Sequence, residues 1–293
     1  MRNFVLWQTA ACLVVLIMAA PAARGQSEKA QPPANLLTRS ITRHETARLQ
    51  FGGTVTLSGA PAGSIVIHGW QRNEVEIKAT IELQAPTAAD LDLLATLNTF
   101  VVDQEVDHIR ILTTGTHDRA FMKHATKKFP KALLGLPWKI DFQISLPAMT
   151  DLEVDAGVGP IELSGVEGAL RLNALSSVAD LELTGGLVSV LIQGGEINLR
   201  VPNRNWHGLG AEVRLASGKL SVELAAGFSG DLNADVLRTG EIRSTFPDLQ
   251  PRSPNSIGPT SVRARAGMGG ATLNFTVGDG TVEIKQIGGS SRQ

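Results

Sequence analysis

Acidic side chains that alternate with apolar residues are the strongest candidates for chemistry in this sequence. They lie in the segment 151–183 and are Glu153, Asp155, Glu162, Asp180 and Glu182. Two carboxylates held roughly 5 to 10 Å apart can cleave a glycosidic bond. The outward face of a half-buried strand must also be polar, and Glu is a common way to fill it. We favour this second interpretation, a solvated strand face, over a catalytic pair.

The histidines form no pattern that binds a metal. The six are His44, His68, His108, His117, His124 and His207. No two have the i, i+4 spacing of a helical zinc site, and none adjoins a carboxylate cluster in ligand order. The segment Gly278-Asp279-Gly280 is similar to part of a calcium loop, but it has one acid and is predicted to be a tight hairpin turn. We expect no bound metal.

Common catalytic motifs are also missing from the sequence. It has no Gly-x-Ser-x-Gly nucleophile elbow and no phosphate loop that ends in Gly-Lys-Ser/Thr. We therefore expect no catalytic residue, no cofactor and no enzyme activity.

A basic stretch in the middle of the chain allows two interpretations. It is predicted to be helical over residues 118–134, and its cations are Arg119, Lys123, Lys127, Lys128 and Lys131. Phe121, Ala125 and Phe129 fall on one helical stripe. A basic amphipathic helix can make a weak contact with an anionic membrane surface. We favour the alternative, in which the apolar stripe covers an open end of the fold.

The first 25 residues have the order of a secretory signal peptide. A positive start at Arg2 precedes an apolar stretch over 4–20, and small residues follow it. Cleavage fits after Ala22 or after Gly25, and we expect the second; an uncleaved membrane anchor is the alternative. Cys12 lies within the apolar stretch, whereas a lipid-bearing cysteine should follow it. We predict a periplasmic or secreted protein without lipid.

Composition limits what the mature chain can bind. Cys12 is the only cysteine, so the mature chain can form neither an internal disulfide nor a thiolate metal site. Loss of residues 1–25 removes Arg2 and Arg24 and no acid, so the formal charge falls from -1 to -3. This balance argues against nucleic-acid binding, which needs a basic surface. No later stretch has the roughly 18 apolar residues of a membrane span, so we expect no transmembrane segment.

Period-two alternation of apolar and polar residues predicts an all-β fold after a flexible leader at 26–42. Strands are expected from residue 43. Thr87 can cap a helix near 87–101, in which Leu91 and Leu94 keep helical spacing. A basic segment, 113–137, is expected as an insertion.

A repeat of 18 residues is the most informative feature of the sequence. It relates the strands that start at Leu152, Leu170 and Val188. The strands between them start at Ile161, Leu181 and Ile197, so the middle one is displaced by two. A short period with two strands per repeat is typical of a solenoid, whose repeats share one core. The residues expected in that core are Val154, Leu163, Leu172, Leu183 and Val190.

The same register places two charges on neighbouring repeats. Glu153 and Arg171 are 18 residues apart and should meet as an exposed lateral pair. At the C-terminal end, the strand from Ala271, the Gly278–Gly280 turn and the strand from Thr281 are predicted to form a closing hairpin.

The order of these features resembles the putative adhesin, or toast-rack, family of exported bacterial domains of unknown function. The carrying segments are 64–70 with 75–78, the helix and strand at 88–112, 142–147, the Gly-x-Ile-x-Leu-x-Gly units, 242–247 and 281–285. The chain departs from the family at 113–137, which is longer than the usual connection, and at 175–178, which lacks a corner glycine. The resemblance implies a right-handed stack of parallel strands in the cell envelope and no catalytic residues.

The sequence therefore predicts a single β-solenoid (toast-rack-like) domain at 43–288 with one or two accessory helices and a tail at 289–293. Its function is expected to be non-enzymatic: adhesion, or organisation of the envelope through an unknown envelope protein or glycan. The alternatives are a polysaccharide-acting hydrolase on a β-solenoid scaffold and a membrane-associated envelope-stress component.

Overall fold

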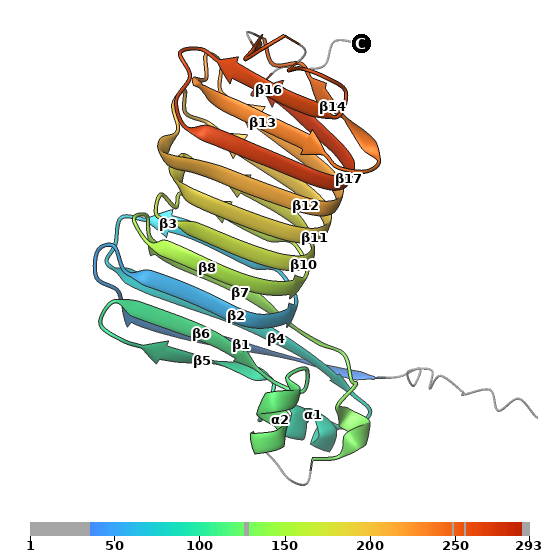
Figure 1. Ribbon diagram of the computed structural model, residues 1–293. Helices are drawn as coiled ribbons and strands as arrows, with labels where there is room; N and C mark the ends of the chain where they lie inside the picture. The colour runs from blue at the N-terminus through green and yellow to red at the C-terminus, as the bar shows by residue number, and fades with distance from the viewer. Residues whose placement is uncertain (1–35, 126–128, 248, 255, 289–293) are drawn as a thin grey trace, which may run out of the picture. The chain divides into compact units, whose positions relative to one another are not determined.

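The computed structural model describes residues 36–288 except 126–128, 248 and 255. Most of this part of the chain is β-strand, and it forms one large mixed sheet (Figure 1). The strands are β1 (Leu37–Arg48), β2 (Thr54–Ala62), β3 (Ile65–Trp70), β4 (Glu74–Ala85), β5 (Thr99–Gln104), β6 (His108–Thr114), β7 (Trp138–Pro147), β8 (Asp151–Val158), β9 (Ile161–Ser164), β10 (Leu170–Glu182), β11 (Gly185–Val201), β12 (His207–Leu224), β13 (Gly230–Val236), β14 (Gly240–Ser244), β15 (Leu249–Pro251), β16 (Ser261–Ala266) and β17 (Thr272–Gln286).

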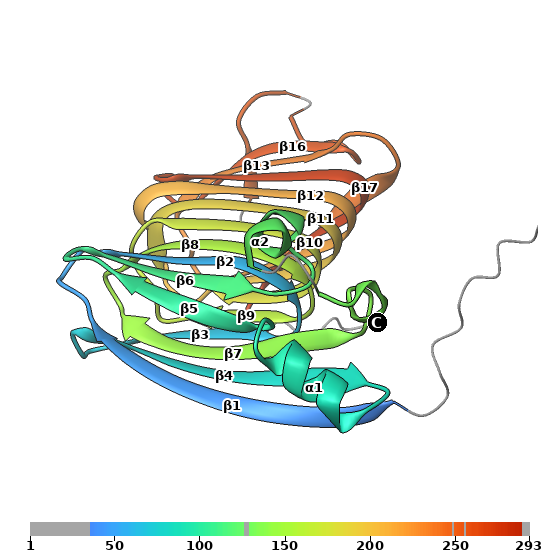
Figure 2. The same cartoon turned by 90° about the horizontal axis from the view of Figure 1, so that it is seen from below.

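The sheet folds over into two layers because four long strands, β10, β11, β12 and β17, each bend at a corner and contribute to both (Figure 2). The pairings order the first layer as β5-β6-β2-β8-β10-β11-β12-β17-β13-β16-β15. They order the second layer as β1-β4-β7-β3-β9-β10-β11-β12-β17-β14. One hydrophobic core lies between the two layers.

Alternation along each strand decides which side chains enter this core. Leu172 of β10 is paired with Val154 of β8 and with Val190 of β11, and all three are buried. The predicted column of residues 18 positions apart is thus confirmed. Leu163 and Leu183 are buried as expected.

The middle strands of the repeat pair differently from the prediction. Ile161 lies opposite Ala179, and Ala179 lies opposite Ile197. The 18-residue spacing is therefore kept in both layers, and the displacement by two was wrong. Ala179 is small and was overlooked as a core residue, yet it is fully buried.

Parallel pairing occupies the middle of the sheet and reaches its edge only at β14, which pairs with β17. The pairs β1–β4, β4–β7 and β5–β6 at one end are antiparallel, as are β13–β16 and β15–β16 at the other. The parallel stack that the resemblance implies is therefore found among the repeat strands, and a parallel solenoid is not confirmed for the sheet as a whole. The handedness of the stack stays a prediction.

Strands inserted out of chain order build both ends. At one end β2 pairs with β6 and β8, and at the other β17 pairs with β12 and β13. The predicted closing hairpin at 271–285 is wrong, because β17 runs through Gly278–Gly280 as one strand and all its pairings are parallel. These glycines form a sheet corner, which uses the same residue type as a hairpin turn.

The predicted leader extends too far along the chain. Residues 37–42 belong to β1, which pairs with β4 over its whole length. Thr38, Ile41 and Thr42 are β-branched residues, which are suited to a strand. Residues 26–35, the tail at 289–293 and the signal peptide lie outside the described residues.

The first helix begins where predicted and ends earlier. α1 spans Ala88–Ala95, and the Thr87 side chain accepts a hydrogen bond from the Asp90 backbone N–H. Leu91 and Leu94 are buried against the sheet, but Val101 lies in β5 and is exposed. The β-branched run that follows Asn98 pairs with β6 instead of continuing the helix.

The basic segment is not one helix. α2 spans Arg119–Ala125, residues 126–128 are outside the described part, and a short 3-10 helix, η1, spans Lys131–Leu133. Pro130 has an extended conformation, and the residue before a proline is disfavoured in a helix. Figure 1 shows α1 and α2 at the end of the sheet where β1 and β5 lie. Core contact comes from Phe129, Leu133 and Leu136, which follow α2.

We predict that Leu172→Ala lowers the free energy of unfolding by about 2 to 5 kcal/mol, because it opens a cavity between three rungs. Leu175→Ala is the control, since Leu175 is on the same strand with 53% of its surface exposed. It should change stability by no more than about 0.5 kcal/mol. Urea denaturation compares the two variants, and equal losses would contradict the assigned core.

A second prediction uses adjacent glycines at the corner between the layers. A Cβ on Gly195 would lie 2.0 Å from the Ser177 carbonyl oxygen at a φ of +121°, whereas a Cβ on Gly194 would meet nothing closer than 4.0 Å. Gly195→Ala should therefore destabilise the protein by at least about 1 to 3 kcal/mol. Gly194→Ala should leave stability unchanged or raise it by up to about 1 kcal/mol. Thermal melts of both variants test this, and the reverse order of stability would refute the corner geometry.

Candidate functional site

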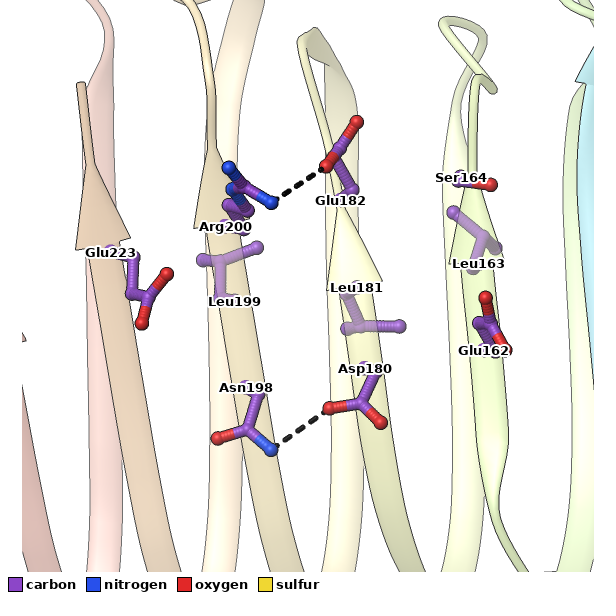
Figure 3. A pocket seen from close by; sticks show the side chains of 10 residues that line it. All are labelled: Glu162, Leu163, Ser164, Asp180, Leu181, Glu182, Asn198, Leu199, Arg200 and Glu223. Carbon is purple, nitrogen blue, oxygen red and sulfur yellow. Dashed lines mark hydrogen bonds and ion pairs between the residues drawn. The ribbon is translucent and has the colours of Figure 1, made fainter. Parts of the chain in front are cut away.

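The outer surface of the second layer carries a shallow hollow across β9, β10, β11 and β12. Its volume is about 590 Å³ (Figure 3). The exposed or half-buried polar side chains that line it are Glu162, Ser164, Asp180, Glu182, Asn198, Arg200 and Glu223. They come from successive rungs because alternate residues of each strand point outward.

Register alignment places these side chains in two rows. In the first row Asp180 lies opposite Glu162 on one side and Asn198 on the other. The Asn198 amide donates a hydrogen bond to the Asp180 carboxylate at 2.9 Å. Among the hydrogen bonds of the described residues, none uses the Glu162 carboxylate.

The second row pairs its members along the sheet. The Arg200 guanidinium lies 3.6 Å from the Glu182 carboxylate, and Lys285 lies 3.1 Å from that of Glu223. At the other end of the row, His68 Nδ1 and Ser164 Oγ are 3.1 Å apart. Exposed pairs of this kind contribute only about 0 to 1 kcal/mol each, so they hold the side chains in place more than they stabilise the fold.

The acidic residues singled out in the sequence do not share one face. Glu153 and Asp155 belong to β8 in the first layer, whereas Glu162, Asp180 and Glu182 belong to the second. The chain turns the corner between them, so Glu153 and Glu162 point outward from opposite layers. These two cannot form a catalytic pair, whereas Glu162 and Asp180 lie on neighbouring strands of one layer.

For the predicted lateral pair of Glu153 and Arg171, the strand register is confirmed but the ion pair is not. Arg171 lies opposite Glu153. Ion pairs among the described residues do not include this pair. Two residues further along the strands, the Asn173 amide donates a hydrogen bond to the Asp155 carboxylate at 2.7 Å.

Metal binding has no structural support in the described part of the chain. There, no group of three or more His, Cys, Asp or Glu residues is arranged to hold an ion. Within the same residues, no helix has the length and apolar character needed to cross a membrane.

A second hollow, of about 680 Å³, lies in the inserted segment between β6 and β7. His117 is in its wall, with its ring 5.3 Å from that of Trp138. Burial lowers the pKa of His117 below its ordinary value of 6.5, while Asp118 and a hydrogen bond with the Gly59 backbone oppose the shift. Sequence reasoning assigned no role to His117, because Gly59 and Trp138 are far from it in the chain.

This shift predicts a pH dependence of stability. Because the folded state of His117 binds a proton less readily than the unfolded state, stability should fall as pH drops below about 6.5 and level off below the lowered pKa. His117→Gln should show a smaller loss between pH 7.5 and pH 5. Urea midpoints at the two pH values measure it, and an unchanged loss in the variant would contradict the assignment.

No family model matches the sequence, and no curated protein matches it either. Solved structures to which it is similar include a putative cell adhesion protein from Clostridium sporogenes, at 13% identity and a TM-score of 0.37, which covers 84% of this chain and 100% of that one. A putative adhesin from Bacteroides fragilis has 11% identity and a TM-score of 0.34, with 85% and 97% covered. A third, from Parabacteroides distasonis, has 11% identity and a TM-score of 0.25, with 83% and 97% covered.

Two of these neighbours are called putative adhesins and one a putative cell adhesion protein, which agrees with the family that the sequence resembles. Likeness at such identities and TM-scores carries no function over to this chain.

Proposed function

We propose that this chain is an exported, non-enzymatic binding module of the cell envelope, acting in adhesion or envelope organisation. The observation that carries the proposal is the hollow on the second layer. It presents two rows of hydrogen-bonding side chains at the fixed spacing of neighbouring strands, about 4.8 Å. Sites on a rigid sheet hold their geometry better than sites on loops.

The charges of the hollow indicate what kind of ligand would fit. Its lining contains Glu162, Asp180, Glu182 and Glu223 but one cation, Arg200. Carboxylates accept hydrogen bonds and do not donate them. The fitting partner presents donors, as the hydroxyls of a glycan or the amines of an envelope protein do. A nucleic acid would be repelled, because its phosphates are anionic.

Export is supported by the signal-like order of residues 1–25. The periplasm or the outside of the cell is the location that follows. A protein in the periplasm or outside the cell is next to the envelope and its ligands.

The hydrolase alternative is supported by one observation, that Glu162 and Asp180 lie on neighbouring strands. A glycosidase needs a general acid held in an environment that excludes water. Both carboxylates are exposed on an open face, so we favour binding without cleavage.

We predict that the double variant Asp180→Asn/Glu182→Gln binds its envelope ligand about 10- to 100-fold more weakly. A hydrogen bond to a charged group contributes about 1.5 to 3 kcal/mol, which corresponds to that range. The matched control is Glu153→Gln/Asp155→Asn, which removes the same charges from the first layer. Cosedimentation with isolated envelopes and titration with soluble envelope glycans measure binding, and a reducing-sugar assay on the same samples measures cleavage.

The outcomes of these assays distinguish envelope binding from polysaccharide hydrolysis. Loss of binding in the second-layer variant alone, without release of reducing ends, supports the proposal. Cleavage that disappears with Glu162→Gln or Asp180→Asn would establish the hydrolase instead. If the original chain and both double variants bind equally, or if none of them binds, the hollow is not the recognition surface.

A further inference from the structure

The hollow in the inserted segment between β6 and β7 has the composition of an amphiphile site. Its wall includes Met122 of α2 and Leu134, which follows η1. His117 adds an aromatic surface beside Trp138. A volume of about 680 Å³ lies within the range of small-molecule pockets, which are mostly apolar with a few polar groups.

Its charged residues are of one sign. Arg119 and Lys123 of α2 line the hollow, and the described residues of its lining include no carboxylate. The two are four residues apart, so they lie on the same side of the helix. The cations thus stand together beside an apolar wall.

Both sides of the hollow are anchored. On one side, the Asp118 carboxylate accepts hydrogen bonds from the backbone N–H groups of Ala120 and Phe121, which fixes the start of α2. On the other side, Leu133 is buried in the core one residue before Leu134. The described walls are therefore held by contacts that do not involve a ligand.

We propose that this hollow binds a single-chain anionic amphiphile, a fatty acid, with its tail against Met122 and Leu134 and its carboxylate at Arg119 and Lys123. The site is separate from the second-layer hollow and does not depend on the proposed envelope binding. Cationic side chains beside an apolar wall match a molecule with one negative end and one apolar end. Arginine also suits a carboxylate geometrically, since its guanidinium can donate two parallel hydrogen bonds.

A bilayer surface is the less suitable occupant. Interfacial helices bind in proportion to the apolar area that they bury, and α2 has seven residues, about 10 Å of helix. Met122 and Phe121 are half-buried rather than displayed to solvent. The hollow is open but concave, so it can hold one chain along its wall, whereas a flat membrane surface cannot follow that wall.

The test is isothermal titration of the mature chain, residues 26–293, with dodecanoate below its micelle concentration. We expect saturable binding at one site, and at least tenfold weaker binding of dodecanol, which has the same tail without the charge. Arg119→Gln/Lys123→Gln should weaken dodecanoate at least tenfold and leave dodecanol unchanged. Met122→Glu should weaken both ligands.

The control variant is Lys131→Gln/Arg171→Gln, which removes two positive charges outside the lining and should bind dodecanoate like the original chain. Circular dichroism and melting temperature verify that each variant is folded. Absence of saturable dodecanoate binding, or binding that Arg119→Gln/Lys123→Gln does not weaken, would overturn the proposal. Binding to phosphatidylglycerol vesicles without binding of monomeric dodecanoate would also overturn it, in favour of a membrane contact. The envelope-binding assay of the second-layer variants is independent of all these outcomes.

Discussion

The close approach of backbones at the corner is the constraint on which the rest of the structure depends. There, a Cβ on Gly218 would lie 1.8 Å from the Gly195 carbonyl oxygen, and a Cβ on Gly280 would lie 1.7 Å from that of Gly218. A side chain at these positions would separate the rungs. Since each rung turns at the same point, the corner aligns the strands of both layers at once, and the core column around Leu172 follows from that alignment.

The strand register set at the corner also determines the arrangement of side chains on the outer surfaces. Because side chains alternate between the two sides of a strand, fixing the corner also fixes which polar residues meet on neighbouring rungs. Asp180 meets Asn198, and Glu182 meets Arg200. The same corner separates Glu153 from Glu162 and divides one acidic sequence pattern into two surfaces. The proposed recognition surface is thus a consequence of the packing.

Departures from the repeat are concentrated where the sheet ends. Antiparallel strands and α1 replace the regular rungs there, and the inserted segment with α2 leaves the sheet altogether. The hollow on the regular outer face is lined by polar rows, whereas the inserted segment, anchored at two points, adds a hollow with an apolar wall. At this end of the sheet, Arg43 connects the two layers. Its guanidinium lies over the Phe100 ring and donates a hydrogen bond to the Phe100 carbonyl oxygen, which links β1 with β5.

The sequence by itself determined the local features. Alternation identified the strands and the buried column of Val154, Leu172 and Val190, and Thr87 identified the start of α1, because side-chain direction and capping depend on near neighbours in the chain. Only the tertiary structure decided that β17 lies between β12 and β13, that Gly280 turns a corner instead of closing a hairpin, and that the His117 ring lies beside that of Trp138. These outcomes depend on which distant segments pair. A glycine or an alternating strand is compatible with several partners, and the choice among them is made by the packing of the whole sheet.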